Sequence, residues 1–294
     1  MNEIINQHLL FVINPCSGVG CINWEERILA YLAPFQHQLT FFNLTKNTQH
    51  NNLLEEITKL QPNIVIAVGG DGTIRFVATC LLNINIPLGI IPAGSANGLA
   101  MELGMTNDLA HSLDTILTGF KKTIHAIEIN HQICIHLSDI GLNAHAIRKF
   151  EMQQNRGFWG YFLASLKVLW NTPKIKASLE FNNQVVNTKA ELIVIANCTM
   201  YGTGAIINPI GVLNDTKFEI VVVKIISLFE IFKMVFSHAK FDPDKTVVYQ
   251  TSKILIKTNK KAHFQMDGEY LGKVNQINAT IIPKAISVIV PVQK

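Results

Sequence analysis

The sequence predicts a chain of two folded parts, an α/β domain built on a parallel sheet and a second domain that is largely antiparallel β. Over the first ~125 residues, strand-like apolar runs alternate with helix-like segments, which is typical of a parallel sheet. Beyond residues 121–124, short strand-like runs follow one another with turns between them. The length of 294 residues suits about two domains. We place the first domain at residues 1–123 and the second at 124–283, and expect 284–294 to return to the first.

The first domain should contain four strands in alternation with helices. The strands are expected at residues 9–13, 39–44, 64–68 and 88–91. The helices are expected at residues 25–32, 52–60, 74–82 and from 98 to about 119. The segment 52–60 illustrates the reasoning, because Leu53, Ile57 and Leu60 recur at helical spacing and form one apolar face.

The second domain should consist of hairpins and further strands. Asn130-His131 separates the paired runs 124–129 and 132–137, and Asn182-Asn183 separates 177–181 and 185–189. Further strands are expected at residues 192–198, 218–223, 247–250, 254–258, 263–266, 278–282 and 286–290. Two helix-like segments, 158–170 and 228–239, interrupt the strands. The first is rich in aromatic residues, including Trp159 and Phe162, and either packs on the β domain or offers a surface to an acyl chain or a membrane.

Composition excludes several classes of protein. Hydrophobic residues make up 48% and charged residues 16%, which excludes a disordered chain. The net charge is +4 without a Lys/Arg cluster, so nucleic acid is not an expected partner, whereas a phosphate-bearing ligand or an anionic membrane is compatible. Five scattered cysteines without a C-x-x-C pair indicate a reducing compartment. No apolar run reaches ~18 residues, so we expect a cytoplasmic protein without a spanning segment.

Three glycine-containing turns follow strand-like runs of the first domain. They are Asn14–Gly20, Gly69-Gly70-Asp71-Gly72-Thr73 and the segment from Pro92 to Gly98. The carboxyl ends of parallel strands meet at one edge of the sheet, where ligands bind. Glycine allows the backbone to approach a ligand, and backbone N–H groups at helix N-termini bind anions. The three turns therefore predict a phosphate cradle.

The carboxylate of Asp71 is the most informative group in these turns. Because a bare carboxylate repels phosphate, Asp71 suits a Mg²⁺ ligand or a proton acceptor. The alternative is a tight strand–helix turn in which Asp71 or Thr73 caps the helix. Other phosphate motifs fit less well: Gly18-Val19-Gly20 is followed by Asn23 where a dinucleotide fingerprint needs glycine, and no complete P-loop occurs.

In their order along the chain, these motifs resemble the diacylglycerol kinase catalytic domain superfamily, which includes bacterial lipid kinases and sphingosine kinases. The resemblance continues through the second half in five blocks. These are Gly141-Leu142-Asn143-Ala144, Ala196-Asn197-Cys198 with Tyr201-Gly202-x-Gly204, Asn208-Pro209, Asn214-Asp215-Thr216-Lys217-Phe218-Glu219 and Met266-Asp267-Gly268-Glu269. The Gly-Gly-Asp-Gly-Thr block alone is shared with NAD kinases and phosphofructokinases, whereas the ordered set is far more specific.

The resemblance implies a Rossmann-like three-layer α/β domain, an antiparallel β-sandwich domain and an active site in the cleft between them. It implies transfer of the γ-phosphoryl group of ATP, with Mg²⁺, to the hydroxyl of a lipid alcohol. The residues that should line the nucleotide are Asn14, Ser17, Thr45, Gly70, Gly72, Thr73, Gly94, Ser95 and Asn97. Asp71, Asp267 and Glu269 should carry the catalytic chemistry, with Asp71 and Asp215 as metal ligands.

The sequence departs from the family pattern at a few positions. Arg75-Phe76 replaces the usual Asn-Glu, Gly98 replaces an acid of the metal network, and Thr216 replaces a glycine. Sphingosine kinases place acids where this chain has His145-Ala146-Ile147, so we expect a neutral, diacylglycerol-like lipid to be preferred over a sphingoid base.

The departures also leave alternatives open. These are another lipid kinase, an NAD-kinase-like phosphotransferase, and a binding protein whose kinase site has decayed. We further expect peripheral contact with the inner face of the membrane in support of lipid metabolism, and leave a homodimer open.

Overall fold

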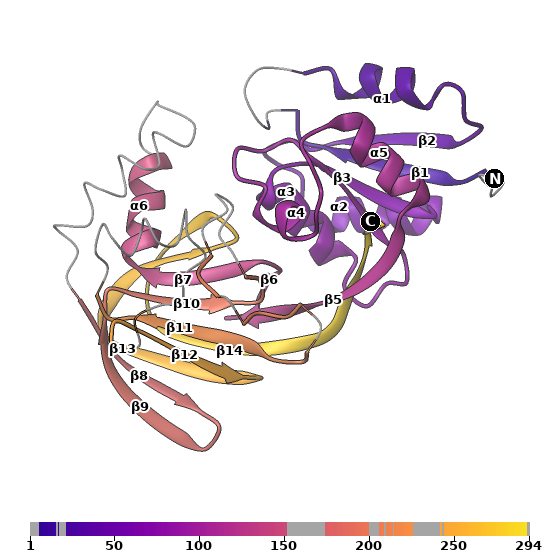
Figure 1. The fold of residues 1–294 in the computed structure, drawn as a ribbon. Helices are drawn as coiled ribbons and strands as arrows, with labels where there is room; N and C mark the ends of the chain where they lie inside the picture. The colour runs from indigo at the N-terminus through magenta and orange to yellow at the C-terminus, as the bar shows by residue number, and fades with distance from the viewer. Residues whose placement is uncertain are drawn as a thin grey trace. The chain divides into compact units, whose positions relative to one another are not determined.

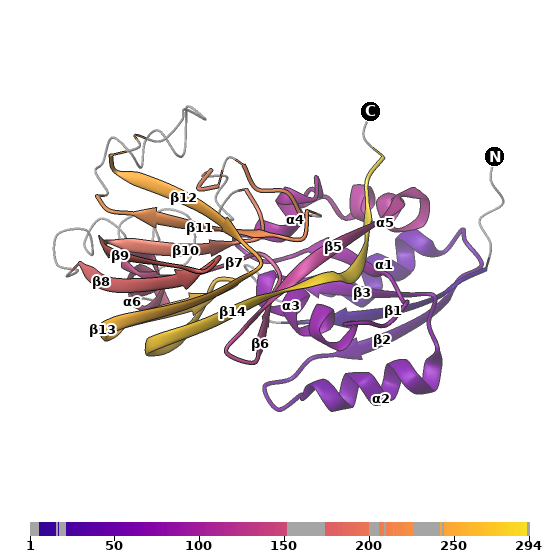
Figure 2. The same ribbon diagram turned by 90° about the horizontal axis from the view of Figure 1, so that it is seen from below.

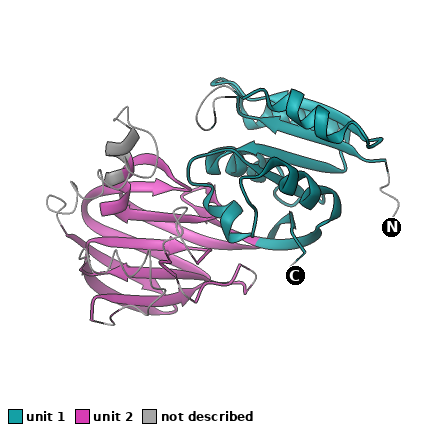
Figure 3. Cartoon of the chain, turned by 45° about the horizontal axis from the view of Figure 1, so that its top comes forward, with its two compact units in different colours: residues 1–124, 284–294 teal, residues 125–283 magenta. Residues whose placement is uncertain are grey.

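The computed structural model describes residues 6–15, 17, 22–151, 174–199, 206–208, 210–213, 215–225, 242 and 244–292. The chain divides into two compact units (Figure 3). Unit 1 comprises residues 1–124 and 284–294, and unit 2 comprises residues 125–283. The helical segments expected at 158–170 and 228–239 lie outside the described residues.

A parallel sheet forms the centre of unit 1 (Figure 1). Its strands are β1 (His8–Ile13), β2 (Gln38–Asn43), β3 (Ile64–Gly69) and β4 (Leu88–Pro92), in the order β4-β3-β1-β2. The last part of β14 (Glu269–Val290) joins β4 in parallel, with Val288 opposite Leu88. Strand β3 is apolar and buried along its whole length, and β1 is so from Leu9 to Ile13, as expected for a parallel sheet that is covered on both faces.

Helices cover the two faces of this sheet. They are α1 (Trp24–Leu32), α2 (His50–Leu60), α3 (Asp71–Cys80), α4 (Gly98–Glu102) and α5 (Leu109–Thr118). Helices α1 and α5 share one apolar core with β1 and β3, and Figure 2 shows α2 on the opposite side of the strands. Helix α1 begins where the Asn23 side chain accepts the amide of Glu26, and α5 begins at Asp108, which caps it in the same way. The expected three-layer α/β arrangement is confirmed.

Unit 2 is an antiparallel β structure. Its strands are β5 (Phe120–Ile129, which starts in unit 1), β6 (Gln132–Cys134), β7 (Leu137–Gly141), β8 (Ile175–Phe181), β9 (Gln184–Ala190), β10 (Leu192–Ala196), β11 (Phe218–Val223), β12 (Thr246–Thr251), β13 (Lys253–Met266) and β14. They pair in the order β12-β11-β10-β7-β13-β14, while β8 joins β13 and β9 joins β8. Helix α6 (Leu142–Glu151) follows β7. Large apolar residues such as Phe218, Phe264 and Ile256 fill the core.

Turn chemistry fixes the hairpins. Both residues of Asn130-His131, Asn182-Asn183 and Asp267-Gly268 have positive φ, the conformation that two-residue hairpin turns require. The first two hairpins were expected from the sequence and are confirmed by the pairing of β5 with β6 and of β8 with β9.

Five expected strand runs differ from the structure. The run 132–137 is broken after Cys134, because the amides of Ile135 and His136 bind the Asp267 carboxylate instead of a neighbouring strand. The runs 254–258 and 263–266 belong to the single strand β13, which has a bulge between Lys257 and Ala262. The runs 278–282 and 286–290 both lie within β14, which enters unit 1 at residue 284. Among the described residues, every helix is too short or too polar to cross a membrane.

Candidate active site

The turns after β1, β3 and β4 lie side by side at one edge of the unit 1 sheet. The Asn14 amide donates to the Val68 carbonyl at 3.0 Å, and the Ala93 amide donates to the Gly69 carbonyl at 2.9 Å. These bonds continue the pairing of the strands into the turns. The turn after β2 lies next to them, because the Leu44 amide donates to the Ile13 carbonyl at 2.8 Å. The three predicted cradle turns, and the position of Thr45, are therefore brought together.

The β3 and β4 turns approach each other through two glycines. A Cβ atom on Gly94 would lie 2.5 Å from the Gly70 Cα, and a Cβ on Gly70 would lie 3.1 Å from the Gly94 Cα. A Cβ on Gly69 would meet the Thr73 hydroxyl oxygen at 2.3 Å. A side chain at Gly94 is therefore excluded by the β3 turn, and a side chain at Gly69 by Thr73 of the same turn. The space above this edge stays lined by backbone groups, which suit a phosphate.

Hydroxyl and amide side chains fix the shape of the cradle. Asn14 donates from Nδ2 to the Thr73 hydroxyl at 3.3 Å, and the Ser17 hydroxyl donates to the Asn14 carbonyl at 2.8 Å. Thr45 is exposed and forms hydrogen bonds with Thr48. Gly72 lies in the first turn of α3, where unpaired helix amides point towards the sheet edge.

Asn97 shapes the β4 turn from within. Its Oδ1 accepts the Gly94 amide at 2.9 Å, and its Nδ2 donates to the Gly94 carbonyl at 2.9 Å and to Asn107 Oδ1 at 3.0 Å. The residue is buried and has φ of +53°, a left-handed conformation that asparagine tolerates. These contacts favour a loop-shaping role for Asn97, whereas the neighbouring Ser95 is exposed.

Asp71 is the first residue of α3 and is only half-buried. One of its oxygens, Oδ1, accepts the Leu99 amide at the start of α4, at 3.3 Å. The second oxygen, Oδ2, forms no hydrogen bond or ion pair with a described residue. Asp71 therefore retains an acceptor oxygen at the edge of the cradle, where it suits a divalent cation that also binds phosphate oxygens.

Asp267 lies in unit 2 and has a different environment. It is 2% exposed and occupies the first position of the β13–β14 hairpin turn with φ of +48°. Its carboxylate accepts the amides of Ile135, His136 and Leu137 at 3.1, 2.9 and 3.2 Å, and the Cys134 thiol at 3.4 Å. These contacts favour a structural role, because the lone pairs already have donors. Glu269 follows in the same hairpin and is exposed.

Asp215 lies in a turn that shows backbone strain. Its Oδ1 accepts the Lys217 amide at 3.1 Å. The next residue, Thr216, has φ of +62°, which is unfavourable for a β-branched side chain, and its amide donates to His125 Nε2 at 3.3 Å. Asn197 connects this turn to the Asp267 region, because its Nδ2 donates to the carbonyls of both His125 and Ile135.

Two buried acids of unit 2, Glu219 and Asp139, belong to its hydrogen-bond network. The sequence analysis did not identify them as members of this network. Glu219 accepts from Asn208 Nδ2 at 2.7 Å and from Gln250 Nε2 at 2.8 Å, and burial raises the pKa of its carboxyl above the usual value in spite of these bonds. Asp139 accepts from the side chains of Asn143 and Gln265 and from the Ala144 amide at 3.0 Å. An acid within an otherwise apolar strand was the available signal in both cases.

The two acids expected to bind Mg²⁺ are each compatible with that role within their own unit. Asp71 and Asp215 each keep a carboxylate oxygen that no described residue engages, whereas the oxygens of Asp267 are occupied by amides. Across the described ranges, no three acidic, histidine or cysteine side chains gather into a metal site. Mg²⁺ usually completes its shell with water and substrate phosphates, so one or two carboxylates are enough.

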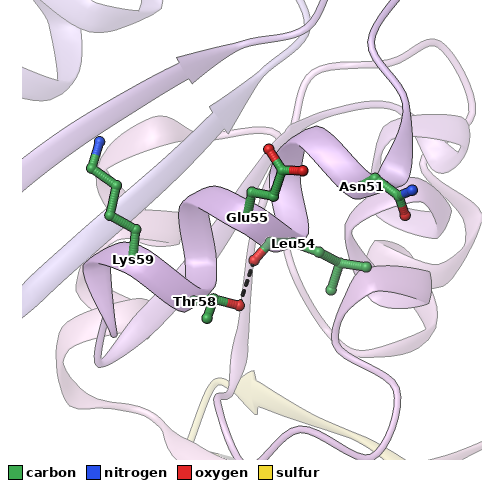
Figure 4. Close-up of a pocket in the computed structure, with 5 residues that line it drawn as sticks. All are labelled: Asn51, Leu54, Glu55, Thr58 and Lys59. Atoms are coloured by element: carbon green, nitrogen blue, oxygen red, sulfur yellow. Dashed lines mark hydrogen bonds between the residues drawn. The ribbon is translucent and has the colours of Figure 1, made fainter.

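A surface depression elsewhere in unit 1 is not a competing site. It lies along one face of α2 and is lined by Asn51, Leu54, Glu55, Thr58 and Lys59 (Figure 4). All five residues belong to a single helix, and none carries the chemistry expected from the sequence.

Comparison with known proteins identifies the class. The diacylglycerol kinase catalytic domain model matches residues 8–129, and the model of the YegS C-terminal NAD kinase beta sandwich-like domain matches residues 138–290. Together they cover most of the chain. The protein belongs to the diacylglycerol kinase catalytic domain family, with the YegS-type β-sandwich as its second domain, and this family is one of lipid kinases.

Individual relatives agree with this assignment. A diacylglycerol kinase of Bacillus subtilis is 24% identical over 218 residues, covering 71% of this chain and 72% of that protein. A diacylglycerol kinase of Staphylococcus haemolyticus is 25% identical over 227 residues, covering 75% of this chain and 69% of that protein. A crystal structure of a diacylglycerol kinase from Bacillus anthracis has the same fold, with a TM-score of 0.72, 18% identity and 97% of both chains covered.

Proposed function

We propose that the protein transfers the γ-phosphoryl group of ATP to the hydroxyl of a lipid alcohol, with diacylglycerol as the preferred acceptor and phosphatidic acid as the product. The observation that carries this proposal is the close contact of Gly70 with Gly94 at the carboxyl edge of a parallel sheet. Membership of a lipid kinase family supports ATP as the donor.

The phosphates of ATP are proposed to bind over this glycine contact. The amides at the start of α3 face the same edge, and an anion there is stabilised by the helix dipole. Asn14, Ser17, Thr73 and Asn97 keep the turns in place, while Thr45 and Ser95 are exposed and can contact the nucleotide. Catalysis then depends mainly on positioning and on neutralising charge at the transferred group.

The acids are proposed to divide the remaining work. Asp71 holds Mg²⁺, which when bound neutralises phosphoryl charge, and Asp215 is the second metal-binding candidate. Glu269 is exposed and is the candidate for orienting or deprotonating the acceptor hydroxyl. Asp267 positions Glu269, because its bonds to the three amides fix the hairpin in which both residues lie.

A neutral acceptor is favoured by the state of the acids near α6. A buried ammonium group requires a nearby carboxylate. Asp139, the buried acid that precedes α6, is already bonded to Asn143, Gln265 and the Ala144 amide. The next residue of α6 after Ala144 is His145, which stacks on His263 with ring centroids 4.4 Å apart. A diacylglycerol hydroxyl needs no counter-ion, whereas a sphingoid base does.

The test is a kinase assay with ATP and Mg²⁺ in mixed micelles that contain diacylglycerol, sphingosine, ceramide or a polyprenol. We expect the highest kcat/KM for diacylglycerol. A tenfold preference for sphingosine, about 1.4 kcal/mol of transition-state stabilisation, would contradict the choice of acceptor. A protein that binds ATP but phosphorylates none of these lipids would support the decayed-site alternative.

The NAD-kinase-like alternative is separated by thermal unfolding. A ligand that binds only the native state raises the melting temperature. We expect ATP with Mg²⁺ to raise it and NAD to have much less effect. A larger shift with NAD, together with phosphorylation of NAD, would replace the lipid kinase proposal.

Access to the acceptor is proposed to occur at the membrane surface, on the cytoplasmic side. The aromatic segment with Trp159 and Phe162 was the expected contact, and it lies outside the described residues. Activity should require a lipid interface and decrease when Trp159 and Phe162 are replaced by serine. Equal turnover of short-chain acceptors without any interface would contradict this part of the proposal.

A further inference from the structure

The outward face of strands β8, β9 and β13 carries an excess of lysine. Alternate residues of β8, namely Ile175, Ala177, Leu179 and Phe181, are buried in the core of unit 2. Successive side chains of a strand point to opposite faces, so Lys176, Ser178 and Glu180 point outwards. The register then places Lys189 of β9 and Lys257 of β13 on the same outward face, and the alternation along β13 adds Lys253.

Most of this positive charge has no acidic partner. Glu180 pairs with Lys257 at 2.7 Å, and Glu191, at the end of β9, pairs with Lys174 at 3.5 Å. Lys176, Lys189 and Lys253 form no ion pair with any described residue. Both acids of this region are therefore already used, and three lysines remain uncompensated.

The placement of two of these lysines is unfavourable for the fold alone. Lys176 and Lys189 are both exposed and lie directly opposite each other in the β8–β9 hairpin. Like charges at directly opposite positions of an antiparallel pair destabilise it. A feature that costs stability without local compensation points to a function elsewhere.

The chemistry of the face indicates which partner it fits. The same face also carries Val185, which is 62% exposed, and Leu255, which is partly exposed and lies between Lys253 and Lys257 on β13. The face has no aromatic side chain or arginine of the kind that stacks on nucleic acid bases. Lysines interspersed with aliphatic side chains suit a bilayer surface, where the lysines meet anionic headgroups and the aliphatic groups enter the interface.

We propose that the lysine face, defined by Lys176, Lys189, Lys253 and Lys257, docks the protein on the surface of an anionic lipid bilayer. The proposal rests on the proposed function, which requires access to a membrane-embedded acceptor, and it names the surface that provides this access. Lysines on an edge strand can also prevent the strand from pairing with another chain. That role involves no lipid, so lipid binding distinguishes it from the proposed docking role.

Vesicle co-sedimentation without ATP or diacylglycerol tests the proposal. Wild-type protein should bind phosphatidylglycerol/phosphatidylcholine vesicles and not pure phosphatidylcholine vesicles. Binding should fall as NaCl is raised from about 0.05 to about 0.5 M, because salt screens surface charge. The Lys176→Gln/Lys189→Gln protein should bind about 25-fold more weakly, since each lysine near an anionic surface contributes about fivefold.

Two matched variants sharpen this result. Lys59→Gln/Lys121→Gln makes the same charge change at exposed lysines of unit 1 and should bind like wild type. Glu180→Gln removes the acid that pairs with Lys257 and should bind more tightly than wild type. The Lys176→Gln/Lys189→Gln protein should melt no lower than wild type, because it loses a repulsion.

Equal vesicle binding by wild type and Lys176→Gln/Lys189→Gln, or equal loss in both lysine double variants, would overturn the proposal. Binding of the wild-type protein to neutral vesicles would also overturn the proposal. Binding of single-stranded DNA without binding of any vesicle would overturn it as well. Turnover of diacylglycerol in micelles of a neutral detergent should be unchanged in Lys176→Gln/Lys189→Gln, because these micelles carry no anionic headgroups. If wild type fails to phosphorylate diacylglycerol in these micelles, the proposed function is contradicted while the vesicle result stands on its own.

Discussion

Asp71 in unit 1 and Asp267 in unit 2 both lie next to a glycine in a tight turn, yet their carboxylates have different surroundings. Asp71 is half-buried and accepts one backbone amide through one oxygen. Asp267 is buried and accepts three amides and a thiol. The first keeps an oxygen for a ligand, and the second holds β6, β7 and the β13–β14 turn together. An Asp-Gly motif thus identifies a carboxylate without revealing how many of its acceptor sites the fold has already used.

The largest expected effect on stability comes from Asp267→Asn. The amide group of asparagine would face backbone N–H donors, leaving buried donors without an acceptor. We expect the free energy of unfolding to fall by about 3 kcal/mol. Asp71→Asn is the matched control and should cost less than about 1 kcal/mol, because asparagine can still accept the Leu99 amide. Denaturant unfolding of both proteins measures this difference, and equal stability of the two would contradict the contrast.

Glycine substitutions sharpen the same comparison at the level of the turns. Gly94→Ala places a Cβ 2.5 Å from the Gly70 backbone and should cost about 2–3 kcal/mol and weaken ATP binding. Gly268→Ala meets no atom within 4 Å and is penalised only by its φ of +83°, at about 1 kcal/mol. Unfolding and ATP titration of both variants test this. ATP affinity reduced as much by Gly268→Ala as by Gly94→Ala would argue against a cradle at Gly94.

The smallest expected effect concerns Glu219 and pH. Burial raises the pKa of its carboxyl above the ordinary value of 4.5. A raised pKa adds stability that is fully present below pH 4.5 and is lost as the pH rises through the folded-state pKa. Glu219→Gln cannot ionise, so wild type should lose stability relative to this variant as the pH rises above 4.5. Parallel stability profiles between pH ~4 and ~8 would show that Glu219 titrates normally.

The sequence allowed the fold class and the cradle turns to be predicted, because both depend on local patterns. Alternating strands and helices, and glycines after strand ends, are visible without any knowledge of distant contacts. The boundaries that failed depend on distant contacts. The break between β6 and β7 is caused by Asp267, more than 100 residues away. The joining of two expected runs into β13 depends on a bulge opposite β14.

The positions of several candidate site residues were predictable, whereas their roles stay a prediction. Asn14, Gly70, Asp71, Thr73 and Gly94 share one sheet edge, as expected. The roles of the unit 2 acids were not predictable from the motif, because they depend on which donors surround each carboxylate. Asp139 and Glu219 illustrate this, since each sits in an apolar strand and is satisfied by amide side chains from elsewhere in the fold.

Steady-state turnover of Asp71→Asn tests the central claim, that the Asp71 carboxylate serves the reaction, most directly. The substitution keeps the hydrogen bond to Leu99 and removes only the charge needed to hold a metal or accept a proton. With saturating ATP, Mg²⁺ and diacylglycerol in mixed micelles, we expect kcat to fall ~10²-fold or more. The free energy of unfolding should change by less than about 1 kcal/mol. A folded Asp71→Asn protein with near-normal turnover would contradict the account.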